Sequence, residues 1–207
     1  MKAQYDDIDE YIADLRQAIE QAPDCAAHHY NLGLALLSKR ELPAAEQSFL
    51  RAVEYSPRLA EAYVQLGGLC LQRGDLDGCL NYNQEAANCQ PRFPVAWANI
   101  GFVRLQRGEA EQAVPAFKKA LKWDPDFVQA LTSLGVAYFM LGDVENSIAF
   151  SERALKVYPD FAPAYNNLAL AWMEKGEAKK AVEYADLAVQ HGFELPEEFK
   201  RELEAYR

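Results

Sequence analysis

Residues 63–75, YVQLGGLCLQRGD, contain the pattern that decides the fold, together with two adjacent glycines. The apolar side chains of Tyr63, Leu66 and Cys70 are spaced as they are on one face of an α-helix. Glycine inside a helix costs up to about 1 kcal/mol relative to alanine. The stretch therefore predicts a helix that has a structural or functional reason to keep two small residues in succession.

The same pattern recurs with a period of 34 residues. The small residues that correspond to the first glycine of the stretch are Gly33, Gly67, Gly101, Gly135 and Ala169. The position twelve residues further on is also small in every unit, and is occupied by Ala45, Cys79, Ala113, Ser147 and Ala181. Prolines close the first four units at Pro57, Pro91, Pro125 and Pro159. A repeat of this length predicts stacked helical units that bury a shared core.

Each unit is predicted to contain two helices. The first ends at a glycine such as Gly74, and the second runs to the closing proline, which cannot continue a helix. Arg40 stands in place of the glycine between the helices of the first unit, so that turn is expected to differ. Small residues are expected to face each other across a pair, for example Gly67 opposite Cys79, because a missing Cβ lets two helix backbones approach closely.

The spacing resembles the tetratricopeptide repeat family. The resemblance implies an all-α fold, a right-handed α-solenoid of five helix-turn-helix repeats. The repeats are expected at 26–59, 60–93, 94–127, 128–161 and 162–193, after a half-repeat helix at 6–22 and before a capping helix at 196–206. No linker divides the chain, so residues 1–207 are expected to form a single solenoid. The sequence leaves open whether Met1 is the natural start.

The composition bears on partners and location. Acidic residues outnumber basic ones by 31 to 21, which disfavours nucleic acid and anionic membrane as general partners. No apolar run is long enough for membrane insertion, and the N-terminus has no apolar leader. The four cysteines have no CxxC spacing, and Cys70, Cys79 and Cys89 are expected to be buried and reduced. These features favour a cytoplasmic protein.

The sequence shows no chemistry typical of an enzyme. It contains no phosphate loop, nucleophile motif or paired catalytic carboxylates, so neither catalysis nor a cofactor is expected. Cys25 and His28 are the nearest approach to a metal site, and two ligands are too few for one. No metal site is therefore predicted.

By the family resemblance, the first helices line a concave groove. The fifth, ninth and twelfth positions of each unit share one helical face, and twelve of these fifteen residues are apolar. The residues expected to contact a partner are Tyr30, Leu34, Val64, Gly68, Leu71, Asn99, Phe102, Leu105, Val136, Phe139, Asn167, Leu170 and Met173. Gly68 would leave a dent in this surface, or would allow tighter packing between neighbouring first helices.

An exposed apolar groove is typical of a protein-interaction site. The predicted function is a non-enzymatic adaptor that binds an apolar or amphipathic segment of a partner protein. The alternatives are self-assembly, through the groove or the N-terminal helix, and burial of the stripe by the curvature of the solenoid. The groove positions hold no lysine or arginine, which argues against the family subgroup that grips a C-terminal carboxylate. The identity of the partner, the pathway and the oligomeric state are not determined by the sequence.

Overall fold

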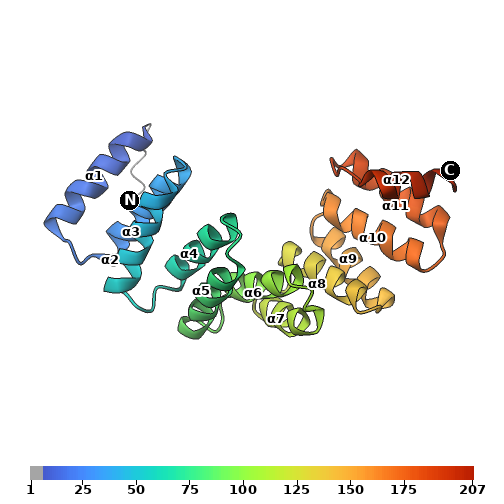
Figure 1. The fold of residues 1–207 in the computed structure, drawn as a ribbon, viewed down its shortest axis with the longest axis horizontal. Helices are drawn as coiled ribbons and strands as arrows, with labels where there is room; N and C mark the ends of the chain where they lie inside the picture. Colours follow the sequence, from blue (N-terminus) through green and yellow to red (C-terminus); the bar gives the residue numbers. More distant parts are fainter. Residues whose placement is uncertain (1–6) are drawn as a thin grey trace. The chain divides into compact units, whose positions relative to one another are not determined.

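The structure, a computed structural model, describes residues 7–207, and these residues form twelve α-helices and no strand (Figure 1). The helices are α1 (Ile8–Gln21), α2 (Ala26–Ser38), α3 (Leu42–Tyr55), α4 (Ala60–Gln72), α5 (Leu76–Cys89), α6 (Pro94–Gln106), α7 (Ala110–Trp123), α8 (Val128–Met140), α9 (Val144–Val157), α10 (Ala162–Glu174), α11 (Ala178–Gln190) and α12 (Glu197–Glu204). The prediction of an all-α fold is confirmed. Residue 6, where the first helix was predicted to begin, lies outside the described residues.

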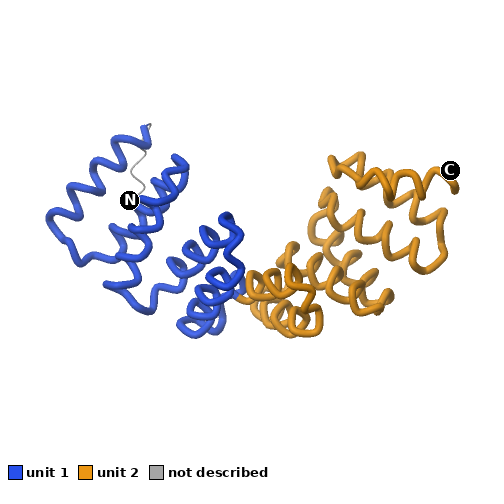
Figure 2. Tube along the Cα trace, viewed as in Figure 1, with its two compact units in different colours: residues 1–96 blue, residues 97–207 orange. Residues whose placement is uncertain are grey.

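The chain forms two compact units, residues 1–96 and 97–207, which divide inside α6 (Figure 2). In the first unit, α1 packs against α2, α2 pairs with α3, and α4 pairs with α5. In the second unit, α8 pairs with α9 and α10 with α11, while α8 also contacts α10. Within each of the two compact units, the paired helices named here that follow each other in sequence are thus neighbours in space, as expected of stacked helical repeats. The repeat boundaries, the count of five and the single continuous solenoid stay predictions.

The turns between the paired helices use the left-handed backbone conformation. Gly74 has φ of 76°, and its amide donates to the Leu71 carbonyl at 3.0 Å. The next amide, that of Asp75, donates to the Cys70 carbonyl at 2.9 Å. These two bonds satisfy carbonyls that the end of a helix would otherwise leave without partners. The glycines therefore end the first helices, as predicted.

The first turn departs from the sequence-based expectation. Arg40 has φ of 61°, and its amide donates to the Leu37 carbonyl at 2.9 Å. The amide of Glu41 donates to the Leu36 carbonyl at 2.9 Å. The prediction that this turn would differ is wrong: the two capping bonds impose the same geometry, although a Cβ is unfavourable at positive φ.

Close helix crossing explains the first of the two adjacent glycines. A Cβ added to Gly67 would lie 3.4 Å from the carbonyl oxygen of Cys79 and would overlap the side-chain amide of Asn83. The predicted approach of Gly67 to Cys79 is confirmed, with Asn83 as the nearer neighbour. Gly67 is therefore required by the packing of α4 on α5.

The cysteines follow the predicted burial only in part. Cys70 and Cys79 are buried, whereas Cys89 is half-buried, with its sulfur 3.3 Å from the carbonyl oxygen of Pro57. The prediction of burial is wrong for Cys89, which is the last residue of α5 and therefore lies where the pairing with α4 ends. All four thiols are free.

Candidate functional site

The thirteen predicted groove residues lie on first helices of the pairs, and most are half-buried. Leu71 and Phe102 are the most accessible, at 36% and 37% exposed, while Asn167 is 9% exposed. The half-buried members are Tyr30, Leu34, Val64, Gly68, Asn99, Leu105, Val136, Phe139, Leu170 and Met173. The apolar stripe is therefore neither sealed in the interior nor fully exposed.

In the first unit, the predicted face combines an aromatic ring with an open position. The ring of Tyr30 lies 5.8 Å from that of Phe49, and burial raises the pKa of its phenol, with a smaller contribution from the charge of Glu61. A hydrogen bond with Gln65 acts on this pKa in the opposite direction. A Cβ added to Gly68 would meet no atom within 4 Å. Gly68 thus leaves open space, which is the first of the two alternatives that the sequence left open.

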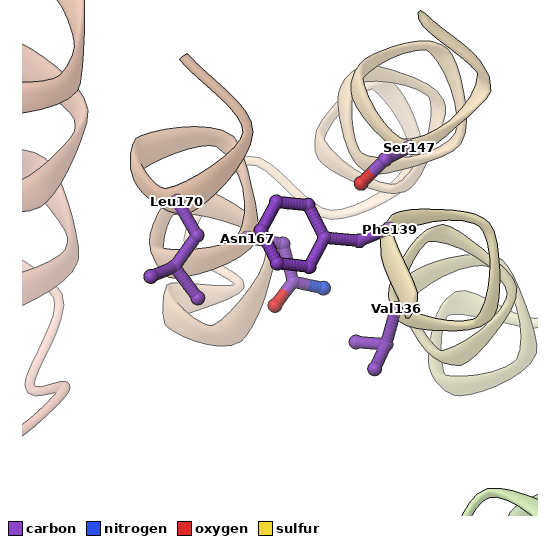
Figure 3. A pocket seen from close by; sticks show the side chains of 5 residues that line it. All are labelled: Val136, Phe139, Ser147, Asn167 and Leu170. Carbon is purple, nitrogen blue, oxygen red and sulfur yellow. The ribbon is translucent and has the colours of Figure 1, made fainter. Parts of the chain in front are cut away.

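In the second unit, four predicted residues meet around a cavity of about 40 Å³ (Figure 3). Val136 and Phe139 come from α8, and Asn167 and Leu170 from α10. The fifth lining residue is Ser147, near the start of α9. The cavity therefore lies where three successive helices of this unit meet.

Local helix geometry places these side chains. Val136 and Phe139 are three residues apart, as are Asn167 and Leu170, so each pair lies on one face of its helix. Phe139 extends from α8 toward α10, and the hydroxyl of Ser147 points toward the same space (Figure 3). The contact between α8 and α10 brings the two apolar faces together.

Two polar side chains face the cavity in different states. The amide nitrogen of Asn167 donates to the backbone carbonyl of Thr132 at 3.2 Å, so this nitrogen of a residue predicted to contact a partner already has a hydrogen-bond acceptor within the chain. The Oγ of Ser147 is buried and has no hydrogen-bond partner among the described residues. None of the five lining residues carries a charge.

Ser147 is the site residue that the sequence-based prediction missed. The signal was available, because the corresponding positions of the other four 34-residue repeats hold Ala45, Cys79, Ala113 and Ala181. A hydroxyl at a position that is otherwise apolar marks a place where packing alone does not explain the residue. The thirteen predicted groove residues all lie on first helices, whereas Ser147 reaches the cavity from a second helix, α9.

The described residues also bear on metal binding and membrane insertion. Among residues 7–207, no three His, Cys, Asp or Glu side chains converge in a way that suits a metal ion. No helix in that same range has the length and apolar character needed to cross a bilayer.

Solved structures with a similar fold share little sequence with this chain. YrrB, a TPR protein with an unusual peptide-binding site, is 20% identical, with a TM-score of 0.71 over 86% of this chain and 92% of its own. MamA from Desulfovibrio magneticus is 19% identical, with a TM-score of 0.71 over 80% of this chain and 94% of its own. PilF of Pseudomonas aeruginosa is 18% identical, with a TM-score of 0.73 over 82% and 78%. At these identities the likeness establishes the fold alone.

Sequence comparisons agree with the repeat pattern. A search of curated proteins gave no significant match. A family model described as "Tetratricopeptide repeat" matches residues 7–59 and 149–194, and another of the same description matches 128–161. A model described as "TPR repeat" matches 103–142. Together these models cover well over half of a chain whose helices pair as the repeat requires, and the chain belongs to the tetratricopeptide repeat family.

Proposed function

We propose that this protein is a non-enzymatic adaptor whose first helices bind an apolar or amphipathic segment of a partner protein. The binding residues are the thirteen groove residues given above. Partner recognition rests on burial of apolar side chains, because the groove positions hold no lysine or arginine. The cysteine usage supports a location in a reducing cytoplasm.

One observation carries this proposal. Val136, Phe139, Asn167 and Leu170 were selected from the sequence for a groove, and all four line one cavity. Phe102 adds a large aromatic side chain that is 37% exposed on α6, in the same unit. Aromatic and aliphatic side chains in and around a small concave site are the usual anchors of a protein interaction.

The test is selection of peptide ligands by the purified chain from a random peptide library displayed on phage. The wild type is expected to enrich peptides with apolar residues at helical spacing. Phe102→Glu is expected to weaken the binding of an enriched peptide by at least about tenfold, because it places a charge in an apolar contact. Circular dichroism should be unchanged, since Phe102 lies at the surface.

A matched control uses the outer face of a second helix. Leu50 on α3 is 41% exposed, and the same position in the later 34-residue repeats holds Gln84, Lys118, Glu152 and Asp186. Leu50→Glu therefore introduces the same charge where the fold accepts polar residues, and binding should stay unchanged. Equal binding by wild type and Phe102→Glu would remove the groove from the proposal.

The same variants test self-assembly. If the groove binds a second copy of this chain, sedimentation will show a dimer that depends on protein concentration and disappears in Phe102→Glu. A monomer at every concentration excludes that alternative and leaves a different protein as the partner.

A further inference from the structure

Ser147 carries a polar group whose environment leaves it without a partner. Its side chain is 1% exposed, and its Oγ makes no hydrogen bond within the described residues. A buried hydroxyl without a partner destabilises a fold. The chain has an apolar alternative at this position, because the first, third and fifth 34-residue repeats hold Ala45, Ala113 and Ala181, each fully buried. The hydroxyl therefore invites an explanation other than packing.

The helices around Ser147 carry little side-chain volume. Gly135 on α8 lies against Ser151 on α9, and a Cβ added to this glycine would be 3.0 Å from the Ser151 Oγ. The second-helix residues that correspond to Ser151 in the first and third 34-residue repeats are Phe49 and Phe117. The α8/α9 crossing thus has small residues where those two repeats place a phenylalanine ring, next to the 40 Å³ cavity that Ser147 lines.

The lining restricts what the cavity can bind. Val136, Phe139 and Leu170 form apolar walls, and no lining residue is charged. A carboxylate or an ammonium group would therefore be buried without a counter-ion, at high cost. A large aliphatic side chain would leave the Ser147 hydroxyl without a partner and exceeds the space, which suits about two or three heavy atoms.

We propose that this cavity binds a short hydroxyl side chain, with threonine as the best fit, projected by the partner segment that the first helices bind. The inference rests on the proposed function and names one anchor residue of the partner. The threonine hydroxyl pairs with Ser147 Oγ, which is able both to donate and to accept. The threonine methyl group packs against Val136 and Leu170.

This arrangement gives selectivity as well as affinity. Valine has the same shape as threonine and satisfies the apolar walls, but it leaves Ser147 Oγ buried without a partner. A site that contains a polar group discriminates strongly against an analogue that cannot pair with it. Threonine is therefore favoured over valine for one reason, which a single substitution in the protein removes.

The experiment uses peptides enriched by the wild-type chain from the random library. For a peptide with a threonine or serine anchor, the dissociation constant is measured by calorimetry with threonine and with valine at that position. Against the wild type, valine is expected to weaken binding by about tenfold. Against Ser147→Ala, the ratio should fall to about twofold or less, since the cycle isolates the hydroxyl pair.

Ser151→Ala is the matched control. Ser151 Oγ is also buried without a partner, yet Ser151 does not line the cavity. Both alanine variants should fold and gain some thermal stability, because each removes a buried, unpaired hydroxyl. Only Ser147→Ala is expected to lose the preference for threonine.

The possible failures are distinguishable. If no enriched peptide depends on Phe102, the proposed function fails and this inference fails with it. If peptides depend on Phe102 but show the same threonine-to-valine ratio with wild type and Ser147→Ala, the proposed function stands and the hydroxyl anchor is wrong. An equal loss of preference in Ser151→Ala also overturns the anchor.

Discussion

Gly33 lies directly against the ring of Phe49 where α2 crosses α3. A Cβ added to Gly33 would be 2.5 Å from Cε1 of the ring, a separation that real Cβ atoms essentially never show. Both residues are buried, and Phe49 is 0% exposed. The glycine and the ring therefore form one packing unit, in which the missing side chain of the first makes room for the second.

The first prediction concerns this pair. Gly33→Ala should lower the free energy of unfolding by about 1–3 kcal/mol, because the added methyl group overpacks the crossing. When Gly33→Ala is combined with Phe49→Ala, the alanine at position 33 should lower the free energy of unfolding much less. The fifth 34-residue repeat already has alanine at the same two positions, Ala169 and Ala185. Urea denaturation of the four proteins measures the coupling. Strict additivity of the two substitutions would contradict the packing unit.

The second prediction separates the two adjacent glycines. Gly68→Ala should raise the free energy of unfolding by up to about 1 kcal/mol, because alanine favours the helix and its Cβ enters open space. Gly67→Ala should lower it by about 1–3 kcal/mol, because its Cβ overlaps the side-chain amide of Asn83. Thermal and urea denaturation check both signs. A loss of stability in Gly68→Ala would mean that this surface is packed.

The third prediction concerns the strained turn. Arg40 is the only described residue other than glycine with positive φ. Relief of this strain is worth about 1–2 kcal/mol, and the extra freedom of glycine in the unfolded chain offsets about half of it. Arg40→Gly should therefore raise the free energy of unfolding by about 0.5–1 kcal/mol.

The converse substitution provides the control for this turn. Gly108 has φ of 74° at the corresponding position of the third 34-residue repeat. Gly108→Arg should lower the free energy of unfolding by an amount similar to the gain from Arg40→Gly. If both substitutions are neutral, the left-handed conformation carries no cost here.

The fourth prediction is a dependence of stability on pH at the start of α9. Hydrogen bonds from the side chain and backbone amide of Asn146 lower the pKa of Asp143 from its ordinary value of 3.8. A carboxyl group with a lowered pKa in the folded state adds stability above its unfolded pKa, and this stability is lost as the pH falls through the folded pKa. The contribution should therefore be present at neutral pH, begin to decrease below about pH 4, and be lost as the pH falls through the lowered pKa of Asp143.

Asp143→Asn removes the titration and keeps a side chain that caps a helix. The difference in free energy of unfolding between pH 7 and pH 3 should be smaller in this variant than in the wild type. Urea denaturation at the two pH values measures it. The hydrogen bond with Lys175 lowers the pKa of Glu145 too, so Glu145→Gln should act in the same direction. An unchanged difference in both variants would contradict the linkage.

The sequence by itself determined the helices and where they end. Local chemistry fixes these features: apolar residues at helical spacing, a glycine that adopts positive φ, and a proline that cannot continue a helix. The need for glycine at position 67 was also readable, because the period places it opposite a small residue. Four of the five residues around the cavity were identified from the repeat register together with the family resemblance.

Only the tertiary structure decided the remainder. Arg40 adopts the glycine conformation because two capping bonds outweigh its side-chain strain, a balance that residue identity does not reveal. The amide nitrogen of Asn167 donates a hydrogen bond to the carbonyl of Thr132, a residue 35 positions away. Whether this nitrogen is free to bind a partner therefore depends on how α8 lies against α10. Ser147 Oγ has no hydrogen-bond partner among the described residues, a state that depends on how the side chains of α8, α9 and α10 pack around the cavity. Periodicity specifies which residues share a face, whereas side-chain packing across helices decides which polar atoms are left to bind a ligand.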